Sequence, residues 1–178
     1  MSSTQQPVQE ALFDLGPDEE VGYRVPIACQ VAGITYRQLD YWARTKLVVP
    51  SIRGARGSGS QRLYSFRDVL VLKIVKRLLD TGISLQNIRL AVEKLRDRGV
   101  HDIAEITLVS DGNTVYECRS NDEVIDLLGG GQGVVGIAVP GIMKELTGTI
   151  ASFPSERIDA EGKAGEDELA SRRQRRSS

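Results

Sequence analysis

The sequence contains few of the residues that bind metals, form disulfides or span membranes. Two cysteines and one histidine among 178 residues are too few for a closed zinc site or a disulfide framework. The longest apolar stretch, residues 69–75, includes Lys73 and is far shorter than the roughly 20 residues that cross a bilayer. The first 20 residues are polar and acidic, unlike a secretory signal. We therefore expect a cytoplasmic protein with no membrane span, no bound metal and no cofactor.

Groups that perform catalysis are scarce as well. The single histidine, His101, has no set of partners that would make it the general base of a nucleophilic centre. The glycine-rich stretch 129–133 lacks the Lys-Ser/Thr pair of a phosphate-binding P-loop. We do not expect an enzyme.

The formal net charge of −1 conceals a strong segregation of charge along the chain. Residues 1–21 carry five acidic side chains and no Lys or Arg, residues 22–99 have a net charge of +10, and residues 100–154 have a net charge of −6. The tail 155–178 holds six charges of each sign. Ten excess positive charges on one folded segment favour a polyanionic partner, although a solvated basic face has the same composition.

These divisions also predict the domains. The acidic arm 1–21 and the tail 155–178 are rich in polar residues, and we expect both to be disordered. Residues 22–99 form the predicted basic domain, and residues 100–154 a small module of about 50 residues, near the lower size limit for independent folding.

The basic domain begins with two short helices. Pro26 suits the first turn of a helix that ends at Ala32, because its missing N–H needs no partner there. Gly33 tolerates the positive φ of a tight reversal, and Thr35 is a good N-cap for a second helix over 36–45. Two helices that cross closely at such a turn are typical of a helix-turn-helix.

A glycine-rich basic segment follows the second helix. Residues 53–60 read Arg-Gly-Ala-Arg-Gly-Ser-Gly-Ser, which excludes regular structure. The flanking residues 47–49 and 62–64 have strand character, so we expect them to pair as a hairpin with a basic tip. A helix-turn-helix followed by such a hairpin is a winged helix-turn-helix.

Two further helices complete this domain. Ser65 is the expected N-cap of a helix over 66–80, and Ser84 of a helix that ends near Arg96. Gly82 separates the two helices and Gly99 ends the domain.

The periodicity changes after Gly99. Residues 106–109 and 114–118 flank a turn signal and predict a hairpin. Asn121 is the expected cap of a short helix that ends at Leu128, followed by a strand over 134–139 and a helix after Pro140. The predicted fold is therefore mainly α with small β, a winged helix-turn-helix followed by a small α+β C-terminal module.

Residues 23–95 resemble the DNA-binding domain of MerR-type regulators. The recognition helix of that family commonly reads Thr-Leu-Arg-Tyr-Tyr-Glu, and residues 38–43 here read Gln-Leu-Asp-Tyr-Trp-Ala. The family wing commonly ends in Gly-Tyr-Arg-x-Tyr, and residues 60–64 read Ser-Gln-Arg-Leu-Tyr. The resemblance implies a transcription regulator that binds duplex DNA as a homodimer on a two-fold symmetric promoter site and distorts the operator. It also makes RNA polymerase a further candidate partner.

Candidate DNA-binding residues follow from this frame. The first turn of a recognition helix reads base edges in the major groove. Arg37 lies in this turn, and its partner is either a guanine edge or a phosphate. Arginines of the wing are expected to meet phosphates or the minor groove, whereas Tyr64 is equally suited to support the wing. The predicted DNA-binding residues are Thr35, Tyr36, Arg37, Tyr41, Arg53, Arg56, Arg62 and Tyr64.

The sequence also departs from the family pattern. Asp40 stands where the family usually has Arg, which removes a phosphate contact and adds a repulsive charge. The long dimer-forming helix of the family is not evident after Arg98, so we expect residues 100–154 to supply the dimer contact. Two other functions stay open: a protein-interaction adaptor, favoured by Asp40 and the acidic apolar patch 12–15, and a switch that responds to a small molecule.

Overall fold

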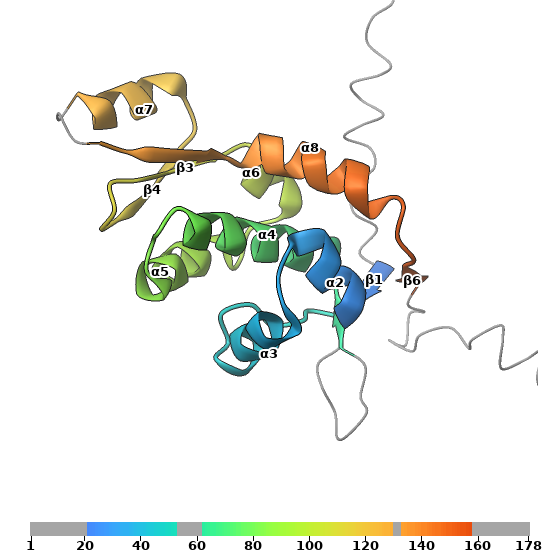
Figure 1. The fold of residues 1–178 in the computed structure, drawn as a ribbon. Coiled ribbons are helices and arrows are strands. Elements are labelled where there is room, and N and C mark those ends of the chain that lie inside the picture. Colours follow the sequence, from blue (N-terminus) through green and yellow to red (C-terminus); the bar gives the residue numbers. More distant parts are fainter. Residues whose placement is uncertain (1–20, 53–61, 130–132, 158–178) are drawn as a thin grey trace, which may run out of the picture.

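The computed structural model describes residues 21–52, 62–129 and 133–157. The expected acidic arm, the tip of the wing with Arg53 and Arg56, and most of the C-terminal tail lie outside these residues. In the described part, no helix is long and apolar enough to cross a membrane. The mainly helical fold with small sheets agrees with the sequence-based expectation (Figure 1).

The chain begins with β1 (Val21–Arg24), which leads directly into α2 (Val25–Ala32). Gly33 ends α2 with φ of 72°, in the left-handed region, and the N–H of Ile34 returns to the carbonyl of Cys29 at 3.0 Å. This tight reversal leads into α3 (Tyr36–Arg44). The helix-turn-helix is therefore built as the glycine and the capping residues predict.

The partner of the second wing strand differs from the expectation. β2 (Leu63–Tyr64) pairs antiparallel with β1, whereas residues 47–49 form no strand. Instead, the N–H groups of Leu47 and Val48 both donate to the carbonyl of Trp42, and both side chains are buried. The apolar character of residues 47–48 thus reflects core packing after α3, and the predicted strand over 47–49 is wrong.

Two further helices follow the wing. α4 (Phe66–Asp80) and α5 (Leu85–Leu95) begin at the predicted caps Ser65 and Ser84. The first of them, α4, packs against α2, α5 and the C-terminal helix α8 (Val139–Ile150). Asp68, in the first turn of α4, is buried and accepts hydrogen bonds from the N–H and the hydroxyl of Ser51, each at 2.7 Å. This carboxylate ties the chain just before the wing tip to the start of α4.

The C-terminal part combines a small sheet with three helices. It runs through α6 (Val100–Ala104), β3 (Thr107–Ser110), β4 (Val115–Cys118), α7 (Asn121–Leu128), β5 (Val135–Ala138) and α8 (Val139–Ile150). The strand order is β4-β3-β5, entirely antiparallel. The N-cap of α7 is Ser120, whose hydroxyl accepts from the N–H of Glu123, so the cap lies one residue before the expected Asn121.

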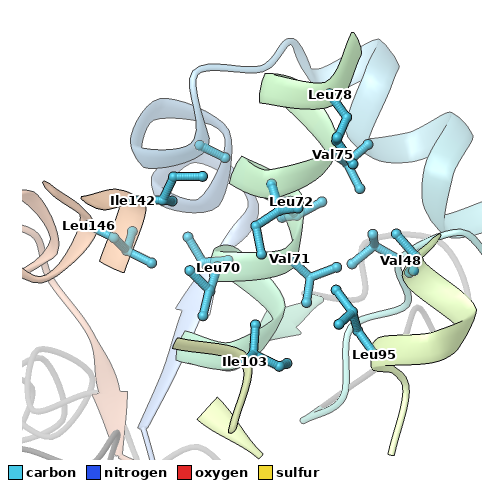
Figure 2. Close-up of a cluster of buried hydrophobic side chains, with 14 of the residues drawn as sticks. Val48, Leu70, Val71, Leu72, Val75, Leu78, Leu95, Ile103, Ile142 and Leu146 are labelled. Atoms are coloured by element: carbon cyan, nitrogen blue, oxygen red, sulfur yellow. The ribbon is translucent and has the colours of Figure 1, made fainter. Parts of the chain in front are cut away.

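One hydrophobic core joins the two expected domains. Val139, Ile142, Leu146 and Ile150 of α8 are buried in the same cluster as the apolar residues of α2 and α4. Figure 2 shows Ile142 and Leu146 in this cluster together with Leu70 of α4. In addition, β6 (Glu156–Arg157) pairs with β1, so the first residues of the expected disordered tail are part of the fold. The change of charge near Gly99 therefore does not mark a break in the core.

Candidate nucleic-acid interface

The start of α3 is fixed by a reciprocal capping box. The Thr35 hydroxyl accepts from the N–H of Gln38 at 3.1 Å, and the Thr35 N–H donates to the Gln38 side-chain oxygen at 3.0 Å. Two N–H groups that would lack helical partners are thereby satisfied. Thr35 is exposed, and in this structure its hydroxyl serves the helix cap.

α3 has one buried and one exposed face. Leu39 and Trp42 are buried in the core. On the opposite face, the Tyr36 and Tyr41 side chains are 62% and 46% exposed, although both are large and partly apolar. Arg37 is exposed beside them. The structure thus brings three of the predicted site residues together on the solvent face of one helix.

Asp40, an acidic residue on the same helix, forms ion pairs with two arginines. Asp40 Oδ1 accepts from Nη2 of Arg62 at 2.8 Å, and Asp40 Oδ2 lies 2.9 Å from Nε of Arg44, one turn further along α3. The hydrogen bond from Arg62 is the main cause that lowers the pKa of Asp40, so the carboxylate stays ionised at neutral pH. The repulsive charge expected at Asp40 is therefore compensated by two arginines.

Tyr64 lies beneath this surface and not on it. Its side chain has no exposed area, and burial raises the pKa of its phenol to about 12. Its hydroxyl has no hydrogen-bond partner among the residues that the structure describes. Of the two roles considered for Tyr64, the burial favours support of the wing over contact with DNA.

Sequence reasoning missed two arginines near the end of α3. Arg44 is mostly exposed on the same face as Tyr41. Arg89, on α5, donates to the carbonyl of Thr45 at 2.8 Å and so holds the C-terminal end of α3. The spacing of Arg44 from Tyr36, Arg37 and Asp40 places them on the same side of a helix, which is a signal that sequence analysis can use. No local pattern indicates the contact of Arg89 with Thr45.

The two cysteines have structural positions. Cys118 is buried in β4, and Cys29 is partly buried in α2. Burial raises the pKa of both thiols, which keeps them protonated at neutral pH. In the described ranges, no three His, Cys, Asp or Glu side chains gather as a metal site would require.

Comparison with known proteins agrees with this geometry. The family model described as the MerR HTH family regulatory protein matches residues 23–95. Uncharacterised HTH-type transcriptional regulators of Mycobacterium bovis and Mycobacterium tuberculosis are 72% identical over 174 residues, which cover 96% of this chain and 77% of theirs. The HTH-type transcriptional regulator HmrR of Sinorhizobium medicae is 30% identical over 83 residues, 46% of this chain and 54% of its own.

Proposed function

Because this chain belongs to the MerR family of helix-turn-helix transcriptional regulators, we propose that it binds a specific, two-fold symmetric promoter site as a homodimer in the cytoplasm. The observation that carries the proposal is the solvent face of α3. There, two aromatic side chains and an arginine are exposed along a helix whose other face is buried in the core. Such a helix fits the major groove of duplex DNA.

The roles of the residues follow from their exposure. Arg37 is placed to donate two hydrogen bonds to a guanine edge, and Tyr36 and Tyr41 to contact the sugar-phosphate backbone and the base edges beside it. We assign Arg53 and Arg56 of the wing to phosphates or the minor groove on the strength of their charge in a glycine-rich segment. Thr35 orients the helix, and Tyr64 supports the wing stem, by which we mean β2 and its partner strand β1.

A dimer is required if two recognition helices are to reach successive turns of one DNA face, ~34 Å apart. We propose that residues 100–154 provide the contact. The apolar face of α8 is already buried in the shared core and is not free for a partner, and we place the contact on the sheet. β5 is an edge strand that carries no charged residue, and Val135 at its start is 46% exposed. Edges without charges are open to pairing with another chain, here a second copy.

Regulation through operator distortion fits this arrangement, since two wings and two helices on a rigid dimer impose a shape on the DNA. We propose RNA polymerase as the protein that reads the distorted promoter. Of the two features that favoured the adaptor alternative, the charge of Asp40 is paired in the structure. The other feature, the acidic apolar patch 12–15, lies outside the described residues.

Selection of bound genomic DNA by the purified protein tests the proposal. The expected result is one enriched, inverted-repeat sequence with half-sites about one helical turn apart. A titration with salt on random duplex DNA is the companion measurement, because phosphate contacts make affinity fall steeply with salt. Enrichment of no sequence, together with salt-independent binding, would contradict the proposal.

A further inference from the structure

Asp40 and Arg62 join the recognition helix to the wing. Asp40 lies in the middle of α3, and Arg62 is the residue immediately before β2, where the chain returns from the wing tip. Their contact at 2.8 Å is shielded, since the side chains are 23% and 16% exposed. A charge-assisted hydrogen bond at this length is among the stronger polar contacts, and burial reduces its screening by salt.

The guanidinium of Arg62 is turned toward the protein. Its Nη2 donates to Asp40, and its Nη1 is buried with no hydrogen-bond partner among the described residues. Arg44, by contrast, is paired with the same carboxylate and is 68% exposed. Of the two arginines on Asp40, only Arg44 therefore presents its charge to a ligand from solvent.

The chain on each side of Arg62 limits how far it can move. β2 follows at once and is held in the core by Leu63 and Tyr64, which are almost completely buried. Tyr64 also pairs with Tyr23 of β1. β2 is thus anchored to β1 on one side, and the contact with Asp40 anchors it to α3 on the other.

We propose that Asp40 is a positioning residue, which holds Arg62 away from DNA phosphates and fixes the wing stem against the recognition helix. This inference rests on the proposed DNA binding and assigns a role within that same surface. The pair costs affinity because it withdraws Arg62 from one phosphate contact, but it fixes the position of β2 relative to α3.

The test compares four proteins: wild type, Asp40→Asn, Arg62→Gln and the double variant. The slope of log affinity against log salt on random duplex DNA counts the phosphates that cations contact. If Asp40 holds Arg62 back, Arg62→Gln keeps the wild-type slope, whereas Asp40→Asn frees Arg62 and steepens it by about one. When salt is raised from 50 to 200 mM, the affinity of Asp40→Asn for duplex DNA then falls by a factor about fourfold larger than the factor for wild type. The double variant returns to the wild-type slope, since no arginine is left at position 62.

Three results would overturn the inference. A lower slope in Arg62→Gln means that Arg62 contacts phosphate in the wild-type protein. Equal steepening in Asp40→Asn and in the double variant means that loss of the carboxylate acts without Arg62. An unchanged slope in Asp40→Asn, with only a lower Tm, likewise contradicts it. Asp80→Asn is the matched control, because Asp80 forms a similar pair with Lys76 on α4, outside the candidate interface.

A measurement without DNA separates this inference from the proposed function. If the two residues are coupled, Asp40→Asn and Arg62→Gln each lower Tm by about 2–4 °C, and the double variant falls no further than either alone. Additive losses of Tm would contradict the coupling. If the wild-type protein shows no salt-dependent binding to duplex DNA, the proposed function fails, and the Tm cycle still decides whether Asp40 positions Arg62.

Discussion

Lys73 on α4 places its Nζ 2.9 Å from Oε1 of Glu145 on α8. The same ammonium donates to the carbonyl of Val31 at 3.3 Å, near the end of α2. Lys73 is almost completely buried, with 9% of its side chain exposed, and Glu145 is half exposed. One buried cation therefore links the C-terminal helix to the first helix of the helix-turn-helix, across the expected domain boundary.

The first prediction concerns this link. Glu145→Gln leaves the buried Lys73 with a neutral partner and also removes the pair between Glu145 and Arg77. We expect a loss of about 1–2 kcal/mol in the free energy of unfolding, as for a hydrogen bond to a charged group. Urea unfolding at pH 7 measures it. Asp80→Asn, which breaks an exposed pair on the same helix, should cost less than half as much, and an equal cost would refute the special role of Lys73.

The second prediction concerns pH. The hydrogen bond from Lys73 is the main cause that lowers the pKa of Glu145 below its ordinary value of 4.5. A carboxyl group with a depressed pKa in the folded state contributes stability above its unfolded pKa and loses it as pH falls through the folded value. The stability difference between wild type and Glu145→Gln should thus shrink below about pH 4.5. A difference that stays constant from pH 7 to pH 3 contradicts the assignment.

The helices of the first half were predictable because their signals are local. Ser65, Ser84 and Thr35 cap the helices as expected, and Gly33 adopts the left-handed conformation that its position required. A cap bonds to an N–H two or three residues away, so the sequence alone specifies it.

The remaining features depend on contacts between distant residues. β1 is four residues long and has partners from two remote segments, β2 and β6. No local periodicity indicates such a strand. The pair between Asp40 and Arg62 is of the same kind, since it joins residues that are 22 positions apart, and no local pattern in the sequence indicates it.

The third prediction concerns base recognition. If Arg37 donates to a guanine, Arg37→Ala should remove the preference at one base pair of each half-site, with a loss of ~1–3 kcal/mol there. Binding of sequence-randomised operators by wild type and variant measures the preference at each position. Arg44→Ala is the control, because Arg44 is the last residue of α3 and lies far from the turn that reads bases. This substitution should weaken binding to all sequences alike. A uniform loss for Arg37→Ala would reduce its role to a phosphate contact.

The fourth prediction separates the two functions considered for Thr35. Thr35→Ala removes the acceptor for the N–H of Gln38 and should cost about 1 kcal/mol of stability, as for other N-caps. Thr35→Ser keeps the cap and should restore both stability and DNA affinity. If Thr35→Ser binds the operator more weakly while its stability is normal, the methyl group of Thr35 contacts a base.

The fifth prediction concerns the dimer, and the fold determines how it can be tested. A fragment that ends at Gly99 would lose Ile142 and Leu146 from the shared core, so we expect it to unfold and to report nothing on assembly. The test must instead change the edge of the sheet. The N–H of Val139 donates to the carbonyl of Ile106, so this position is hydrogen-bonded to β3. In an antiparallel pair, hydrogen-bonded positions alternate with positions that are not, and by this register Gly136 is one of the latter. The backbone N–H of Gly136 therefore points away from β3.

Gly136→Pro therefore removes an outward N–H donor without breaking the ladder to β3, because proline is tolerated on edge strands. We expect this variant to sediment as a monomer at concentrations where wild type is a dimer, with a similar Tm. Its affinity for the full operator should fall to that for a half-site, since the two recognition helices are no longer linked. Val49→Lys changes an exposed apolar residue in the first half of the chain and should leave the dimer intact. If Gly136→Pro still forms the wild-type dimer, the contact does not run through the edge of β5.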